Sequence, residues 1–343
     1  MRTELIYESR SLYRDSFRIQ GYAFGTGRKA VCVVGSMRGN EYQQLYMASQ
    51  LIRELKRTEG EDRLTPGCEI LVVPSANPSS MNIAKRFWPI DNTDINRMFP
   101  GYMEGETTQR IAGGIFARAQ QYEYGIQFAS SYMTGLYAPH ISIMKTSLEY
   151  AELAAHFGMP YVILRNTRPY DTTTLNYNWQ IWDTKAFSLY TAQTERIDRE
   201  SALRGVQAVF AFLASLGLVK RVEKLPCGSA DAAQAEADSR TASQENGDTD
   251  CVFAAGGPDS VLPPRIIDDS HILSVRTPAA GLFEPAVSAG QAVRRGMLLA
   301  RVLNPVDGGT LAHLYAPADG IVFFLCGGPM IYEHTAVIKL IPQ

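Results

Sequence analysis

Three short runs carry the strongest pattern in the chain: Asn77-Pro78, RFWPID (86–91) and DINRMFPG (94–101). They follow the apolar run 69–74, which predicts a strand, so their polar side chains are expected in a loop beyond it. Arg97 offers a planar guanidinium that can bind both oxygens of a carboxylate, and Asn96 adds an amide donor. Taken alone, these side chains suit carboxylate binding and bracing of the loop equally well.

Residues 1–222 alternate apolar runs with amphipathic helical patterns, which is typical of an α/β fold. Val206, Val209 and Leu213, for example, recur at helical spacing and predict a helix that faces the core. The alternation predicts a mixed, largely parallel sheet, with active-site loops at the carboxyl ends of its strands. Strands are expected near 29–35, 69–74, 124–130, 160–165 and 184–191, and helices near 42–57, 106–121, 146–157 and 198–216.

Two changes of composition divide the rest of the chain. Residues 223–269 contain GSADAAQAEADSRTASQENGDTD (228–250), which has six acidic residues, one arginine and no aromatic or branched aliphatic side chain. Such a stretch cannot bury enough apolar surface to order itself, so it predicts a flexible acidic linker. Residues 270–343 carry regular glycines between short apolar runs, which predicts turns between short strands in a small all-β domain.

Composition narrows the class of protein. A chain of 343 residues is long enough for two domains with a large core. The net charge of −2 without a basic stripe argues against nucleic acid as a partner. No apolar run has the length of a membrane span, and the first residues lack the apolar core of a signal peptide. Five scattered cysteines indicate reduced thiols. We therefore expect a cytoplasmic protein without a membrane partner.

The run GSMRGNEY (35–42), which follows an apolar strand pattern, and the runs at 77–101 together resemble the succinylglutamate desuccinylase/aspartoacylase family, a branch of the zinc carboxypeptidase superfamily. The family patterns are G-x-H-G-N/D-E and N-P, R-F-x-P-x-D, D-x-N-R-x-F-P-G. The resemblance implies a zinc-carboxypeptidase-like mixed sheet sandwiched by helices over 1–222 and a β barrel-sandwich domain over 270–343. It also implies that Asn96 and Arg97 hold the carboxylate of an acyl-amino-acid substrate.

The resemblance implies a zinc site as well, and the chain departs from it at three positions. Arg38 and Ala129 stand where the family has its two histidine ligands, and Ser188 stands at the position of the catalytic glutamate. Of the family's zinc ligands, only the glutamate is present, as Glu41. A guanidinium has donors only and stays protonated, so it cannot bind a cation. We therefore expect no zinc cofactor, with Arg38 in the place of the metal and paired with Glu41.

The preferred hypothesis is a degenerate family member, without zinc hydrolysis, that binds a carboxylate-bearing acidic small molecule or an active paralogue. Its pocket would consist of Arg86, Asn96 and Arg97. A homo-oligomer is a further expected assembly. The aromatic run 170–190 would form a lid or wall of the pocket, or else pack against the C-terminal domain.

Two other interpretations remain open. Glu41 with His140 or Asp183 could rebuild a metal site, and the chain would then be an active metal-dependent hydrolase of the amide or ester bond of an N-acyl amino acid. Zinc would be its cofactor. Metal-free catalysis would instead need a serine nucleophile, although no base is evident beside the candidates Ser130, Ser131 and Ser188.

Overall fold

The computed structural model describes residues 1–10, 15–131, 133–146, 150–192, 194–220 and 263–343. Most of the predicted acidic linker, 223–269, lies outside these described residues. Within them, no helix has both the length and the apolar character that crossing a membrane requires.

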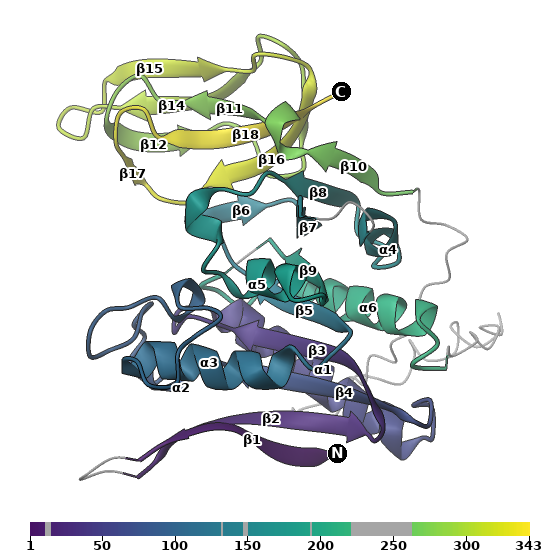
Figure 1. Ribbon diagram of the computed structural model, residues 1–343. Helices are drawn as coiled ribbons and strands as arrows, with labels where there is room; N and C mark the ends of the chain where they lie inside the picture. The colour runs from purple at the N-terminus through teal and green to yellow at the C-terminus, as the bar shows by residue number, and fades with distance from the viewer. Residues whose placement is uncertain (11–14, 132, 147–149, 193, 221–262) are drawn as a thin grey trace, which may run out of the picture.

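The larger part of the molecule is built on a nine-stranded mixed sheet (Figure 1). Strand β3 pairs in parallel with β4 and β5, and β5 pairs in parallel with β9, so the carboxyl ends of these strands meet at one edge of the sheet. The predicted mixed sheet is confirmed. In spatial order its strands are β1 (Arg2–Ser9), β2 (Phe17–Gly25), β4 (Cys68–Ser75), β3 (Arg28–Ser36), β5 (Tyr124–Ala129), β9 (Lys185–Tyr190), β7 (His140–Met144), β8 (Tyr161–Arg165) and β10 (Arg265–Asp268).

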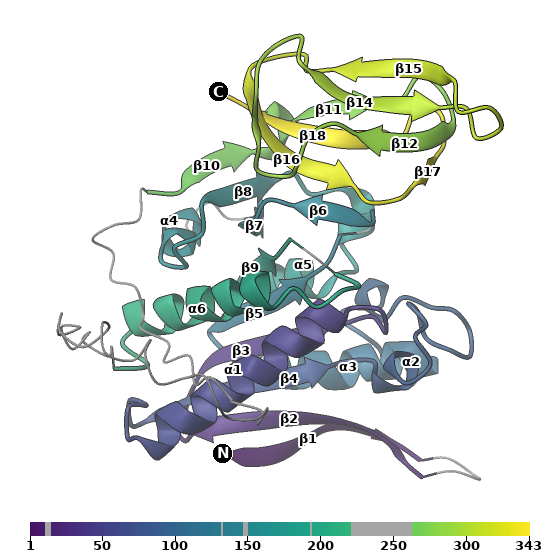
Figure 2. The same ribbon diagram turned by 180° about the vertical axis from the view of Figure 1, so that it is seen from behind.

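Helices cover both faces of this sheet (Figures 1 and 2). Helices α1 (Tyr42–Gly60), α4 (Ala151–Ala155) and α6 (Arg199–Ser215) pack on one face. Helices α3 (Thr107–Ala119) and α5 (Leu175–Ile181) pack on the other. The short α2 (Pro78–Met81) and the 3-10 turns η1 (Ile95–Arg97) and η3 (Pro169–Asp171) lie in the connections.

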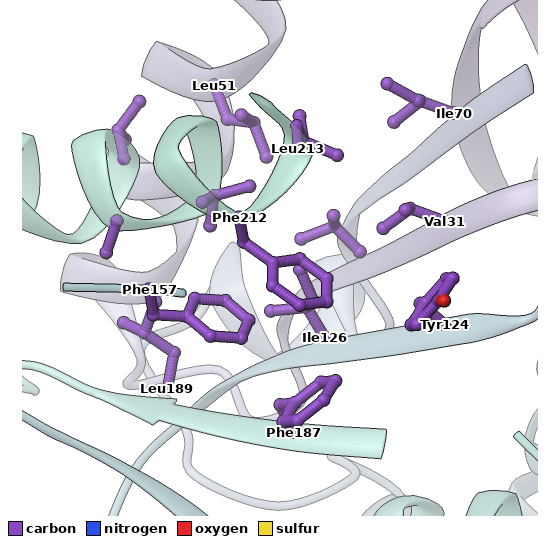
Figure 3. Close-up of a cluster of buried hydrophobic side chains, with 14 of the residues drawn as sticks. Val31, Leu51, Ile70, Tyr124, Ile126, Phe157, Phe187, Leu189, Phe212 and Leu213 are labelled. Carbon is purple, nitrogen blue, oxygen red and sulfur yellow. The ribbon is translucent and has the colours of Figure 1, made fainter. Parts of the chain in front are cut away.

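The core under α6 is rich in aromatic rings (Figure 3). Phe157 and Phe212 stack with their ring centroids 4.2 Å apart, and the Phe187 ring lies 5.2 Å from each of them. These residues come from three elements that are distant in sequence. Ring packing of this kind joins the α6 stripe, predicted from its helical spacing, to the sheet.

Several elements were not predicted. The β1–β2 hairpin at the edge of the sheet is only partly buried. Strand β7 and the three-residue strand β6 (Gly135–Tyr137) are short, and α5 lies within the aromatic run. Helix α4 begins at Ala151 rather than at 146, and residues 147–149 are not among the described residues.

The C-terminal part is an all-β domain of two antiparallel sheets packed face to face, as predicted. Its core includes Leu299, Val322 and Val337, all fully buried. One sheet has the order β11 (Leu273–Arg276), β18 (Ala336–Pro342), β16 (Gly320–Cys326), β13 (Ala292–Val293). The other has the order β15 (Thr310–Tyr315), β14 (Leu298–Leu303), β12 (Gly281–Pro285), β17 (Met330–Ile331).

The two parts exchange strands. β6 leaves the α/β part and pairs with β16, and β10 pairs in parallel with β8. The predicted linker boundary at 269 is therefore too late, because Arg265–Asp268 form the edge strand of the large sheet and Ile267 is buried there. Ile267, Phe323 and Phe324 belong to one apolar cluster between the parts. The C-terminal domain is thus held against the carboxyl end of β8.

Candidate functional site

The loop after β3 folds back around Glu41. The backbone amides of Met37 and Arg38 donate to Glu41 Oε2 at 2.6 and 3.1 Å, and the glutamate is 1% exposed. Residue 39 has to be glycine, because a Cβ there would lie 2.1 Å from the carbonyl oxygen of Lys85. The loop therefore fixes a buried carboxylate at the carboxyl end of the sheet, with the Arg38 side chain beside it.

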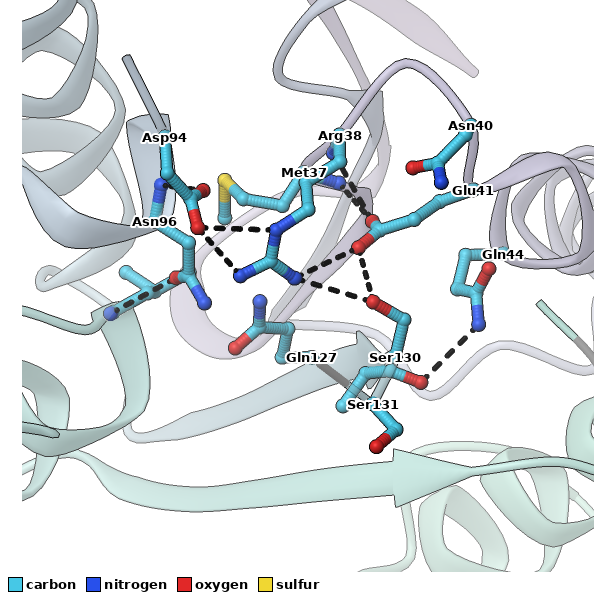
Figure 4. A network of polar contacts seen from close by, with 12 residues as sticks. Met37, Arg38, Asn40, Glu41, Gln44, Asp94, Asn96, Gln127, Ser130 and Ser131 are labelled. Atoms are coloured by element: carbon cyan, nitrogen blue, oxygen red, sulfur yellow. Dashed lines mark hydrogen bonds and ion pairs between the residues drawn. The ribbon is translucent and has the colours of Figure 1, made fainter. Parts of the chain in front are cut away.

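Arg38 occupies the space between two carboxylates (Figure 4). Its Nη1 donates to Glu41 Oε1 at 3.0 Å and to Ser130 Oγ at 3.2 Å, while Nε and Nη2 donate to Asp94 Oδ2 at 3.1 and 2.8 Å. These contacts use four of the five N–H groups. The predicted pairing of Arg38 with Glu41 is confirmed, and Asp94 is a second partner.

The Arg38 side chain stays protonated in this position. Burial opposes the charged form, but the carboxylates of Glu41 and then Asp94 outweigh it and hold the Arg38 pKa above its ordinary value. The guanidinium is 6% exposed and is in effect neutralised by its two partners. Arg38 therefore contributes little free charge to a ligand.

The residues present do not fit a zinc ion. Glu41 already accepts from Met37 N, Arg38 N, Arg38 Nη1 and Ser130 Oγ, so its oxygens are engaged. Ala129 offers no ligand atom in its side chain. A structural or catalytic zinc needs at least three protein ligands. In the part of the chain that the structure describes, no three His, Cys, Asp or Glu side chains group closely enough to hold a metal.

Neither of the two other proposed metal ligands joins Glu41 in a ligand set, although His140 and Arg38 line one cavity. His140 is 4% exposed, its Nδ1 lies 2.8 Å from the carbonyl oxygen of Ala138, and its ring stacks on Tyr190 with centroids 4.6 Å apart. Asp183 precedes β9, so it lies at the amino end of that strand, at the opposite edge of the sheet from Glu41. The structure brings neither residue into a ligand set with Glu41.

Burial lowers the pKa of His140 to about 4, although the Ala138 carbonyl acts in the opposite direction. The folded state thus holds a neutral imidazole, while the unfolded chain takes up a proton near pH 6.5. The free energy of unfolding should fall by about 3 kcal/mol between pH 6.5 and pH 4 through this group. Urea denaturation of the wild type and His140→Asn across this range measures the difference in slope. Parallel curves would contradict the assignment.

A cavity of about 340 Å³ opens beside the Arg38 cluster. Arg97 lines it, donates from Nη1 to the carbonyl oxygen of Tyr170, and places its guanidinium 5.4 Å from the Tyr170 ring. Asn96 also lines it, and its Oδ1 accepts from Leu175 N at 3.3 Å, which positions the start of α5. The structure therefore brings two of the three predicted carboxylate-binding residues together.

Arg86 is the exception. It is absent from the described lining of the cavity, and its guanidinium lies over the Phe87 ring at 5.4 Å. Its carbonyl oxygen accepts from Gly39 N at 3.0 Å. The Arg86 backbone therefore supports the loop that carries Arg38, and carboxylate binding by the Arg86 side chain stays a prediction.

The deep wall of the cavity is polar but neutral. Ser188 lies opposite Gln127 in the β5–β9 register, and Asn176 Nδ2 donates to both, reaching Gln127 Oε1 at 2.8 Å. Asn176 is 4% exposed. No carboxylate stands at the position where the family resemblance placed a catalytic base, so a water molecule there would find no proton acceptor of suitable basicity.

The candidate serine nucleophiles are likewise engaged. Ser130 Oγ donates to Glu41, and Ser131 Oγ lies 3.0 Å from Tyr137 Oη. Glu41 Oε1 is also the ion-pair partner of Arg38, so the carboxylate that contacts Ser130 is not free to act as its base. The arrangement does not form a nucleophile–base pair.

The aromatic run 170–190 has two roles, of which only the cavity wall was predicted. Tyr170 and Tyr190 line the cavity, which fits the predicted wall. Trp179, which belongs to α5, is fully buried, and the Trp182 ring packs edge-on against Phe116. Packing against the C-terminal domain is therefore not the role of the two tryptophans.

Three residues of the site escaped the sequence analysis. Asp94 was quoted as part of a motif, yet nothing in the sequence paired it with Arg38, 56 positions away. Asn176 lies in a helix that the aromatic run concealed. Lys339 lines the cavity from β18 of the C-terminal domain, and only the folded arrangement of the two parts reveals it.

Comparison with protein families matches residues 28–216, more than half of the chain, to the Succinylglutamate desuccinylase/Aspartoacylase catalytic domain. Among curated proteins, the N-alpha-acetyl-L-2,4-diaminobutyric acid deacetylase of Halomonas elongata is 28% identical over 88 residues. That match covers 26% of this chain and 24% of the relative, so it spans about a quarter of the relative's length.

The fold is shared with several solved structures. A succinylglutamate desuccinylase from Silicibacter sp. TM1040 has a TM-score of 0.75 at 17% identity, covering 99% of this chain and 94% of that chain. A succinylglutamate desuccinylase/aspartoacylase from Rhodobacter sphaeroides has a TM-score of 0.72 at 18% identity, covering 98% and 94%. The product-bound ectoine utilization protein EutE from Ruegeria pomeroyi has 0.70 at 18%, covering 95% and 91%.

Proposed function

Because the chain belongs to the succinylglutamate desuccinylase/aspartoacylase family, we propose that it is a member that binds a carboxylate-bearing small molecule without zinc hydrolysis. One observation carries the proposal: the Arg38 guanidinium is buried between Glu41 and Asp94, at the position where the family resemblance places a metal ligand. A single fixed positive charge there can organise the site, but it cannot activate a water molecule.

The neutral deep wall supports the absence of hydrolysis. Hydrolysis of an amide needs a metal-bound or base-activated water, and the residues at this wall are Gln127, Asn176 and Ser188. All three are uncharged at neutral pH. They can donate to and accept from a bound ligand, which suits recognition.

Arg97 supports the binding of a carboxylate. Its guanidinium lines the cavity, and no ion pair with a carboxylate joins it among the described residues. The Tyr170 carbonyl and ring hold it in place. An arginine that is positioned but not neutralised is suited to bidentate binding of a carboxylate. The name of the Halomonas relative, a deacetylase of an N-acetylated amino acid, makes N-acyl amino acids the first ligands to test.

Two measurements test the proposal. Elemental analysis of untagged protein expressed in zinc-replete medium should find far less than one zinc per chain. Thermal unfolding with N-acyl amino acids should then show a rise in Tm that the corresponding amides, which lack the carboxylate, do not give. Near-stoichiometric zinc, or turnover of these ligands, would overturn the proposal in favour of the metal-dependent hydrolase.

Arg97→Ala should weaken carboxylate binding by about 10- to 100-fold, because a charge-assisted pair of hydrogen bonds is lost. Arg97→Lys should retain part of the affinity, since it keeps the charge without the planar fork. Isothermal titration with the best ligand measures both. Arg204→Ala, which removes an exposed arginine on α6, is the matched control. Unchanged affinity in Arg97→Ala would exclude this arginine from the site.

A further inference from the structure

A second group of cations lines the same cavity, separate from Arg38 and Arg97. It consists of Arg165 at the end of β8, Arg168 just before η3, and Lys339 on β18 of the C-terminal domain. The three residues come from both parts of the molecule, so the cationic group exists only where the two parts meet.

Lys339 has no counterion of its own. It is half-buried, its nearest aromatic contact is the Phe324 ring at 6.0 Å, and no hydrogen bond or ion pair to its Nζ is found among the described residues. Burial, followed by the charges of Arg168 and Arg165, lowers the Lys339 pKa. A half-buried ammonium that its neighbours repel costs stability unless an anion joins it.

The Arg168 guanidinium likewise makes no ion pair among the described residues, although the Arg168 backbone amide donates to Asp171 Oδ2 at 3.1 Å. Arg168 Nη1 donates to Tyr170 Oη at 2.6 Å, and both residues line the cavity. Arg165 differs, because its Nη2 lies 2.5 Å from Asp171 Oδ1 and that pair is neutral overall. Arg168 and Lys339 therefore supply the positive charge that a ligand can bind, while the charge of Arg165 is balanced by Asp171.

The other charged groups nearby do not cancel this charge. Asp269 attracts Lys339 at longer range, but its Oδ1 accepts from Asn166 Nδ2, and Arg276 adds repulsion from the side of β11. Two cations thus face the cavity against one carboxylate that does not reach them. An oxyanion entering the cavity would find the Lys339 ammonium and the Arg168 fork together.

We propose that Arg168 and Lys339, backed by Arg165, form a second subsite that binds a phosphoryl group. Two available cations match a dianion better than a singly charged carboxylate, and a lysine ammonium binds phosphate oxygens as a point charge. The inference rests on the proposed function in one respect: the same ligand would place its carboxylate on Arg97 and its phosphoryl group between the domains. The ligand class is then a small phosphorylated or phosphonylated carboxylic acid.

Inorganic phosphate is the first probe, measured at constant ionic strength against chloride. Phosphate should protect Lys339 from acetylation, read by peptide mass spectrometry, while the exposed Lys56 reacts at an unchanged rate. Protection of Lys339 and Lys56 to the same degree, or of neither, would overturn the subsite. This readout needs no substitution and is independent of folding defects.

Lys339→Met should weaken phosphate binding about tenfold, and Lys339→Arg should retain it, because the charge is kept. Lys56→Met is the matched control. Equal phosphate affinity in wild type and Lys339→Met would contradict the proposal.

A bifunctional probe joins the two subsites. 3-Phosphonopropionate should bind at least about tenfold more tightly than phosphate or propionate alone, since linking two groups removes the cost of a second association. Arg97→Ala should abolish this gain while leaving the affinity for phosphate unchanged. Phosphate binding through Lys339 without carboxylate binding through Arg97 would refute the proposed function and retain the subsite. The reverse result would refute the subsite alone.

Discussion

Glu41→Ala should lower the free energy of unfolding by about 3–5 kcal/mol. The substitution leaves Arg38 buried with one carboxylate fewer and removes the acceptor for the amides of Met37 and Arg38. Four buried donors lose their shared acceptor and Arg38 keeps only Asp94, so the effect exceeds that of ordinary surface substitutions. Urea denaturation at pH 7 measures the change.

The control for this loss is Glu200→Ala. Glu200 pairs with Arg204 on the surface of α6 and is 77% exposed, so its removal should have almost no effect on stability. Arg38→Met with Glu41→Gln removes both partners of one ion pair and keeps an acceptor for the amides of residues 37 and 38, so it should be less destabilised than Glu41→Ala. A loss below 1 kcal/mol in Glu41→Ala would mean that Arg38 turns outward in solution.

Arg38→His combined with Ala129→His should raise the bound zinc from the expected value of far less than one to about one zinc per chain. Gln127 and Ala129 alternate onto the same face of β5 and both line the cavity, so an imidazole at 129 would face the Arg38 position. Removing the Arg38 side chain also frees Glu41 Oε1 from one of its four donors, Arg38 Nη1, and removes the positive charge beside the carboxylate. Elemental analysis and competition with a fluorescent chelator measure the gain.

Each single variant is the control for the pair. Ala129→His keeps the Arg38 charge, which repels a cation, and Arg38→His supplies only two ligands with Glu41. Neither should retain zinc through gel filtration. Tight, stoichiometric zinc in Arg38→His alone would show that another residue than 129 completes the site. Hydrolysis is not expected from the double variant, since Ser188 still cannot act as a base.

The sequence predicted the large sheet because its central strands are buried on both faces and form nearly continuous apolar runs, as in β3 and β4. It also predicted the pairing of Arg38 with Glu41, which lie three residues apart. It did not predict Asp94 or Lys339, since their contacts depend on chain segments that meet only after folding. Arg86 lies in the same stretch of sequence as Asn96 and Arg97 but outside the lining of the cavity, which proximity in the sequence does not reveal.

The strand exchange between the two parts bears on how this protein can vary. Pairing of β6 with β16 and of β10 with β8 sets the position of the C-terminal domain through backbone hydrogen bonds. Lys339 is therefore positioned over the cavity by these strand pairs. The segment that joins residue 220 to residue 263 is not needed to place it, whatever the length and composition of that segment. We therefore expect homologous sequences to differ through insertions and deletions in this segment while the cavity keeps its shape.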